Sequence, residues 1–101
     1  MRRELLAFLG IARRAGTVLI GRDAIKSGIR RGKVRFLIIA GDASKRLDRD
    51  LGVECTKYGV EWRRLKSVGK RELGMAIGRF EAAAIALTNE RFAEKVKEIV
   101  R

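Results

Sequence analysis

The chain has 101 residues, which suits one domain, and 47% of them are apolar, enough to bury a core without disulfide or metal staples. Its 24 basic and 12 acidic residues leave a net charge of +12. A single cysteine excludes a disulfide framework and favours a reducing, cytoplasmic compartment. The apolar stretch near Met1 is interrupted too soon for a signal peptide, and no apolar run approaches membrane-spanning length, so we expect no targeting segment and no membrane partner.

The positive charge is unevenly distributed. Residues 1–35 carry ten basic and two acidic side chains, a net of +8, whereas residues 36–60 carry four of each. Sixteen of the basic residues are arginine. The guanidinium group of arginine can donate two hydrogen bonds to the oxygens of one phosphate and can also stack on bases. The absence of Gln and His hints at heat adaptation, but a thermophile's charges come in both signs. A polyanionic partner explains the concentration better.

The first half of the chain reads as two helices and two strands. Apolar residues at helical spacing predict a first helix that ends at Gly16, and residues 17–20 form a β-branched run typical of a strand. A second helix is expected over residues 22–31, stopped by Gly32. The continuous apolar run of residues 36–40 predicts a central strand that is covered on both faces.

The second half continues the alternation. Ser44 is expected to cap a third helix that closes at Gly59, followed by a half-exposed strand at residues 60–63. Ser67 precedes a short helix, residues 82–87 read as a buried strand, and Thr88 or Asn89 caps a last helix. The order predicts an α/β fold, a three-layer α/β/α sandwich around a four-stranded mixed sheet, as a single domain over residues 1–101.

Catalytic chemistry finds little support. Without histidine the chain lacks the commonest general base and metal ligand, so we expect no cofactor, no metal and no enzymatic activity. Cys55 has no histidine to pair with and reads as a buried structural thiol. Asp42 follows the central strand and is expected to begin the turn into the third helix. Gly74 and Gly78 lack the lysine of a phosphate loop and indicate close packing of a helix on the sheet.

The most informative stretch is residues 21–33, GRDAIKSGIRRGK. Arg22, Lys26 and Arg30 fall on one side of the second helix, with Asp23 and Ser27 beside them. The opposite arc, expected to face the sheet, consists of Ala24, Ile25, Gly28 and Ile29. A solvated face is the ordinary interpretation of such a stripe. Two features favour a binding role instead. The stripe starts at a helix N-terminus after Gly21, where free N–H groups attract phosphate. It also has little acidic compensation, because only Asp23 is near.

The same frame resembles the kink-turn RNA-binding family of ribosomal proteins, and especially its small bacterial YlxQ-like members. The resemblance covers nearly the whole chain. It is carried by LGIARRAGTVLIG near the start, by the frame from Gly21, GRDAIKSGIRRGKVRFLIIAGDAS, and by ELGMAIGR later. The resemblance implies an α/β/α sandwich that docks the start of its second helix on the sheared G·A pairs of a kink-turn. It also implies that a loop before the last strand covers the bulged nucleotide.

Individual residues carry over with departures. Gly21 matches the glycine before the docking helix, and the bulge-covering loop contains Gly78, Arg79 and Phe80. Asp23, Ala24 and Ser27 stand where archaeal members have asparagine, glutamate and lysine, which implies weaker or different base readout. Phe80 also fits a core position at the start of the last strand, an alternative of nearly equal weight.

The predicted function is non-catalytic binding of structured RNA, either a kink-turn or ribosomal RNA, by a cytoplasmic monomer associated with the ribosome or another ribonucleoprotein. The predicted RNA-binding residues are Gly21, Arg22, Asp23, Lys26, Ser27, Arg30, Lys33, Arg79 and Phe80. Reversing Arg22 and Lys26 to glutamate is expected to abolish binding and leave the fold. Three alternatives remain: a general structured-RNA binder, the RNA-gripping domain of an RNA-modifying enzyme, and DNA binding, which lacks a recognition helix here.

Overall fold

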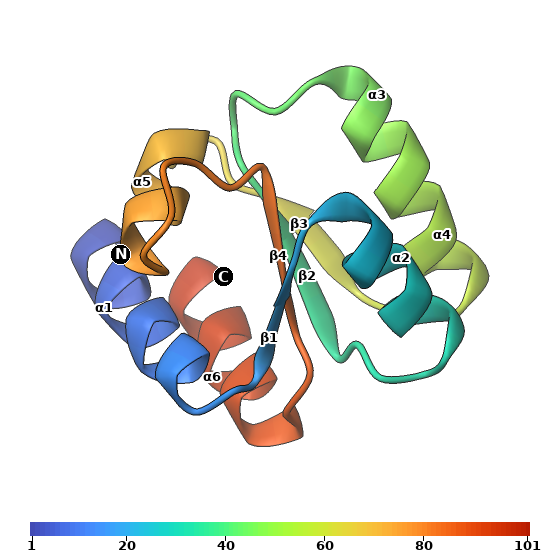
Figure 1. Ribbon diagram of the computed structural model, residues 1–101, viewed down its shortest axis with the longest axis horizontal. Helices are drawn as coiled ribbons and strands as arrows, with labels where there is room; N and C mark the ends of the chain where they lie inside the picture. The colour runs from blue at the N-terminus through green and yellow to red at the C-terminus, as the bar shows by residue number, and fades with distance from the viewer.

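The computed structural model describes all 101 residues, and helices alternate with short strands along the chain (Figure 1). The elements in chain order are α1 (Arg2–Arg14), β1 (Val18–Ile20), α2 (Arg22–Arg30), β2 (Phe36–Ile39), α3 (Lys45–Leu47), the π-helical segment η1 (Asp48–Gly52), α4 (Val53–Lys57), β3 (Trp62–Arg64), α5 (Lys70–Ala76), β4 (Ala84–Leu87) and α6 (Glu90–Val100). The predicted alternation is confirmed. The segment predicted as one third helix is α3, η1 and α4 in succession, and Ser44 caps it by accepting a hydrogen bond from the Leu47 N–H group.

The four strands form one mixed sheet in the order β1-β4-β2-β3. β2 runs parallel to β3 and antiparallel to β4, and β4 runs antiparallel to β1. All four residues of β2 are buried, as are all four of β4, because these central strands are covered on both faces. The predicted central strand is therefore confirmed as β2.

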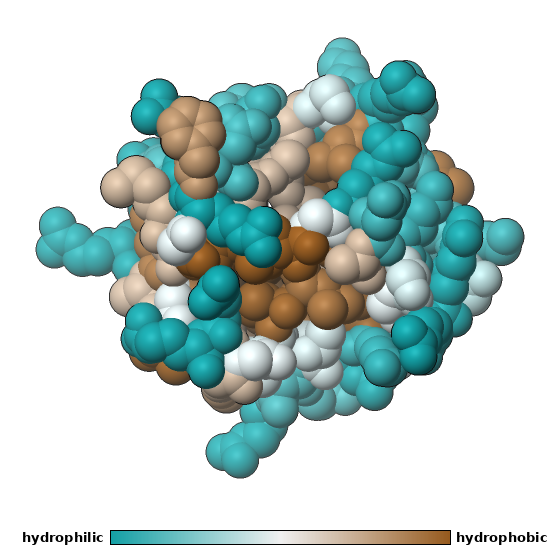
Figure 2. All heavy atoms as spheres, viewed as in Figure 1, coloured by the Kyte–Doolittle hydropathy of each residue, from teal (hydrophilic) through white to brown (hydrophobic).

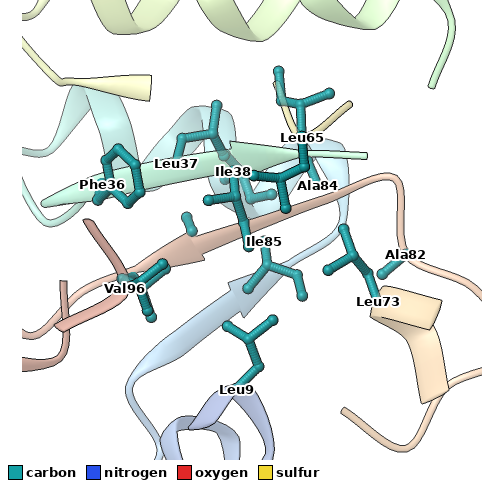
Figure 3. Close-up of a cluster of buried hydrophobic side chains, with 14 of the residues drawn as sticks. Leu9, Phe36, Leu37, Ile38, Leu65, Leu73, Ala82, Ala84, Ile85 and Val96 are labelled. Atoms are coloured by element: carbon teal, nitrogen blue, oxygen red, sulfur yellow. The ribbon is translucent and has the colours of Figure 1, made fainter. Parts of the chain in front are cut away.

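Helices cover both faces of the sheet, which confirms the predicted three-layer sandwich. α1, α5 and α6 lie on one side, and α2, α3, η1 and α4 lie on the other (Figure 1). The buried apolar side chains form one continuous cluster of 26 residues. Figure 3 shows side chains from α1, α5 and α6 around Ile85 of β4: Leu9, Leu73 and Val96. Burying a side chain of this size stabilises the fold by about 1.5–3 kcal/mol.

The sheet has two ends with different contents. At one end, which we call the Gly21 end, β1, β2 and β3 finish, β4 begins, and α2, α3 and α5 begin (Figure 1). At the opposite end, the Gly32 end, α1, α2 and α4 finish and β2 begins. The loop between α5 and β4 returns to the Gly21 end, where the Ala82 N–H group donates to the Lys70 carbonyl.

Candidate nucleic-acid interface

The start of α2 is open to an anion. Gly21 has a φ of 94°, a left-handed conformation that residues with a Cβ rarely adopt, and it turns the chain sharply from β1 into the helix. No side chain caps α2. The first N–H groups of the helix therefore point outward with the positive end of the helix dipole behind them. Phosphate is the natural ligand for such a helix start when cations surround it.

The buried arc of α2 is narrower than predicted. Ile25, Gly28 and Ile29 face the sheet as expected, and a Cβ on Gly28 would lie 2.5 Å from Leu19 Cδ1. Ala24, which was predicted to face the sheet, is exposed instead. It lies in the first turn of the helix, at the edge of the apolar arc. Its methyl group is therefore available at the surface beside the helix start.

The basic stripe of α2 has acidic partners that the sequence did not reveal. Asp50 of η1 lies between two of the cations, 2.8 Å from Arg22 Nε and 2.7 Å from Lys26 Nζ. One turn further along, Arg30 Nε donates to Glu54 of α4 over 2.6 Å. The expectation of little acidic compensation is therefore wrong. The carboxylates come from a neighbouring helical layer, 20 or more residues away in the chain, where a helical-wheel argument does not reach.

These ion pairs perturb the acids. The hydrogen bond from Lys26 holds the pKa of Asp50 below its usual value, and Arg22 and Arg46 add to the same effect. The hydrogen bond from Arg30 lowers the pKa of Glu54 likewise. Both carboxylates are thus anionic at neutral pH, and they hold the three cations of the stripe in fixed positions. A phosphate that approaches α2 must compete with them.

The loop between α5 and β4 projects its side chains into solvent. Gly78 has a φ of 74° and ends α5, with the Arg79 N–H group bonded to the Gly74 carbonyl. The Phe80 side chain is 74% exposed, so the core alternative for Phe80 is wrong. The guanidinium of Arg71 lies 5.1 Å from the centre of its ring. An exposed aromatic ring beside cations is suited to base stacking.

Gly74 explains how this loop is seated. A Cβ at Gly74 would lie 2.3 Å from the Cα of Glu81, so the loop backbone crosses the helix in direct contact. The close packing predicted for Gly74 is therefore against the returning loop and not against the sheet, whereas Gly78 makes no close packing contact and supplies the positive φ that ends α5. The contact directs residues 78–80 outward and brings residues 81–84 toward α2.

Three of the predicted residues meet around one cavity of about 210 Å³ at the Gly21 end: Gly21, Arg22 and Arg79. Leu47 and Leu51 from α3 and η1 form part of its apolar wall, together with Ile25 and the alanines before β4. Figure 2, which views the molecule from the side, shows apolar atoms in the middle of the visible face with hydrophilic side chains around them. An apolar hollow with arginines at its rim can hold a planar base while the rim binds phosphate.

The other predicted residues are dispersed. Asp23, Ser27 and Arg30 lie along the outer face of α2, away from the cavity. Lys33 is at the Gly32 end, because α2 of nine residues separates it from Gly21 by about 13 Å. Four further residues border this surface that no sequence pattern singled out: Leu47, Leu51, Arg46 and Arg71. Their proximity arises from the packing of layers, for which no local pattern exists.

The two residues with side chains that can serve catalysis, Cys55 and Asp42, occupy positions that contribute to the structure. Burial raises the pKa of the Cys55 thiol to about 12, so it stays protonated at neutral pH. Asp42 lies in the turn between β2 and the third helix, as predicted, and its carboxylate also accepts a hydrogen bond from the Lys70 N–H group at the start of α5. No group of three or more potential ligands is placed to bind a metal ion. None of the helices is both long and apolar enough to cross a bilayer.

Fold and surface together define a class: small, basic α/β/α sandwich proteins with an anion-attracting end and no catalytic constellation. Within that class, the model of one family, the ribosomal protein L7Ae/L30e/S12e/Gadd45 family, matches residues 3–97. The chain belongs to this family. The resemblance found in the sequence is thereby confirmed.

Two curated relatives are similar over almost their whole length. The RNA-binding protein YlxQ of Bacillus subtilis (strain 168) is 29% identical over 93 residues, which covers 92% of this chain and 91% of the relative. The RNA-binding protein YlxQ of Enterococcus faecium is 26% identical over 99 residues, covering 98% and 93%. Both names describe RNA-binding proteins and not enzymes, in agreement with the prediction of a non-catalytic protein.

Solved structures show the same fold. A protein of unknown function from Bacillus halodurans superposes with a TM-score of 0.89 at 26% identity, covering 95% of each chain. The Giardia lamblia 15.5kD RNA binding protein superposes with a TM-score of 0.75 at 24% identity, covering 96% of this chain and 82% of that one. These two solved structures thus share the α/β fold of this chain.

Proposed function

We propose that the chain is a non-catalytic RNA-binding protein that grips a kinked or bulged RNA through its Gly21 end. The observation that carries the proposal is the cavity at which Gly21, Arg22 and Arg79 meet, although 57 positions separate the two arginines. The names of the curated relatives support RNA as the polyanion. The bulged nucleotide enters the apolar cavity, and the uncapped start of α2 binds the phosphates next to it.

A kink-turn fits this surface better than a regular duplex. The cavity and the exposed ring of Phe80 both need an unstacked base, which a bulge supplies and a continuous helix does not. Asp23, Ala24 and Ser27 are all exposed at α2. Asp23 lacks the amide donors of the archaeal asparagine, and Ala24 and Ser27 are shorter than the archaeal glutamate and lysine. Recognition therefore rests on RNA shape and on the extruded base more than on the paired bases.

The cellular setting follows from the same chemistry. A basic, single-cored protein without a catalytic centre acts as an architectural component, so we place it on ribosomal RNA or in another ribonucleoprotein of the cytoplasm, as a monomer. Its target RNAs are those in which a sharp kink brings phosphates close together, because the basic protein then offsets the repulsion between them. Purification of the protein from its native cells with crosslinked RNA, followed by sequencing, identifies the RNA.

The test is a titration with two RNAs of equal length and composition, one with a kink-turn and one with its bulge paired. The protein is expected to bind the kinked RNA at least about tenfold more tightly, a difference of about 1.4 kcal/mol. Arg79→Ala is expected to reduce that preference, whereas Arg3→Ala, which removes an unpaired exposed arginine of α1, is the matched control. Equal affinity for the two RNAs would identify a general structured-RNA binder instead.

A further inference from the structure

Among residues 1–35, most of the unpaired positive charge lies at the end opposite to the proposed RNA-binding cavity. Of the ten basic residues among positions 1–35, four form ion pairs: Arg2, Arg22, Lys26 and Arg30. Six have neither an ion pair nor a side-chain hydrogen bond. Five of these six lie at or beyond the ends of α1 and α2: Arg13, Arg14, Arg31, Lys33 and Arg35. Of the paired cations, Arg22 lies at the cavity, whereas Arg30 lies in the last turn of α2, next to the unpaired group.

The fold brings the two groups of cations to one end of the sheet. The Arg35 N–H group donates to the carbonyl of Leu87, the last residue of β4. The next residue, Thr88, donates its N–H to the Thr17 carbonyl, which joins the start of β1 to the same place. Figure 1 shows the ends of α1 and α2 on this side of the molecule, across the sheet from the starts of α2 and α3. All five cations are exposed.

Helix stabilisation accounts for only part of this cluster. Cations in the last turn of a helix stabilise it through the helix dipole, which is a sufficient role for Arg13 and Arg14 of α1. That interaction fades beyond the last turn. Gly32, with a φ of 73°, reverses the chain after α2, so Lys33 and Arg35 lie outside the helix. Three exposed, unpaired cations within five residues (Arg31, Lys33 and Arg35) repel one another and do not help the fold.

An aromatic side chain borders the same surface. Tyr58 is 45% exposed, and Lys57 Nζ lies 5.9 Å from the centre of its ring. Tyr58 lines a hollow of about 390 Å³ with Arg30 and Arg35. Two acids, Glu61 and Glu90, also line that hollow, and Glu61 is paired with Lys97. The two acids make the inside of the hollow unfavourable for a polyanion, so only its basic rim is suited to bind one.

We propose that the Gly32 end is a second RNA-binding surface, at which Arg31, Lys33 and Arg35 bind the phosphate backbone of a separate RNA segment. The proposal rests on the proposed function for its choice of RNA as the polyanion. Arginine donates paired hydrogen bonds to phosphate oxygens, and such contacts to the RNA backbone do not depend on the base sequence. With RNA at both ends of the sheet, one protein molecule holds two RNA segments together. It is then a connector as well as a bulge-binding protein.

The test separates the two binding events. The protein is first saturated with one equivalent of kink-turn RNA, and a labelled plain duplex is then titrated in, with native mass spectrometry to count bound RNAs. The variant Arg31→Gln, Lys33→Gln, Arg35→Gln removes three charges from the Gly32 end. The control variant Arg3→Gln, Lys95→Gln, Arg101→Gln removes the same charge from the surface of α1 and α6. Melting temperatures establish that both variants fold.

The wild type and the control variant are expected to bind the plain duplex as a second RNA. The Gly32-end variant should lose about tenfold or more in that second affinity. Its slope of log affinity against log salt should fall by about 0.7–0.9 for each lost phosphate contact. Its affinity for the kink-turn RNA should stay within about twofold of the wild type.

Three outcomes overturn the inference. No second RNA on the wild type shows that the Gly32 end is only a solvated basic surface, and the proposed function stands if the kink-turn RNA still binds. Equal losses in the two variants show that charge alone matters. If only the Gly32-end variant loses the kink-turn RNA, while Arg79→Ala keeps it, the protein has one RNA site at the Gly32 end, and the cavity proposal fails as well.

Discussion

At the scale of single residues, Phe80 separates a binding role from a structural one. Its ring is 74% exposed, so Phe80→Ala should change the free energy of unfolding by less than about 0.5 kcal/mol. If the ring stacks on an extruded base, the same change should weaken binding of kink-turn RNA by about 1–3 kcal/mol. Urea unfolding and an RNA titration of the purified variant measure the two effects separately.

Phe36 provides the comparison for Phe80. It is 1% exposed at the start of β2, so Phe36→Ala should cost about 3–5 kcal/mol of stability through the cavity that it leaves. Binding by the fraction that remains folded should be nearly normal. A large stability loss in Phe80→Ala, or an unchanged RNA affinity, would contradict the stacking role of the loop.

At the scale of secondary-structure elements, the contact between α2 and the η1–α4 segment is sensitive to acid. The pKa values of Asp50 and Glu54 lie below their unfolded values of 3.8 and 4.5, since Lys26 and Arg30 bond to the ionised forms. These acids therefore stabilise the fold fully above about pH 4.5, and the stabilisation is lost as the pH falls through the lower folded-state values.

Asp50→Asn with Glu54→Gln should lower the urea midpoint at pH 7 and make stability fall less between pH 4.5 and pH 3 than in the wild type. Glu94→Gln with Glu98→Gln removes the same charge from the exposed face of α6 and should leave the wild-type acid response. Parallel stability curves for the wild type and the α2-facing variant would mean that these ion pairs contribute nothing measurable.

The same contact corrects the mutational test that the sequence favours for α2. Glutamates at positions 22 and 26 would face Asp50, so a charge reversal would disturb the fold and confuse the result. Arg22→Gln with Lys26→Gln avoids two like charges. This pair should weaken kink-turn binding at least tenfold more than Arg91→Gln with Lys95→Gln on α6. Fluorescence titration measures the difference, and equal losses would indicate diffuse attraction.

The sequence predicts the fold better than it predicts the candidate site. The periodicity of α1, the apolar run of β2 and the Ser44 cap are local features, and each was predicted correctly. The exposure of Ala24, the pairing of Asp50 with α2 and the π-helical turn of η1 depend on how one layer meets another. The position of Lys33 at the Gly32 end is of the same kind, because its nearness in sequence to α2 says nothing about which end of the sheet it occupies.

At the scale of the whole molecule, the same positive surface charge affects both RNA binding and the stability of the fold. Seven of the 24 basic residues form ion pairs, and the remaining 17 leave a strongly positive surface. In a molecule whose Cα extents are only 31 × 27 × 24 Å, these charges repel one another across distances comparable to the Debye length of about 10 Å at 0.1 M salt. The surface charge therefore opposes folding at low salt and favours RNA binding there.

Stability and RNA affinity should consequently respond to salt in opposite directions. Screening of repulsion should raise the melting temperature between about 20 and 300 mM sodium chloride. Four phosphate contacts, as from Arg22, Lys26, Arg46 and Arg79, should weaken kink-turn binding roughly 50- to 150-fold between 50 and 200 mM salt. Calorimetry and fluorescence titration in matched buffers measure the two trends. A melting temperature that falls with salt would show that the ion pairs, and not the unpaired cations, dominate the electrostatics of the folded protein.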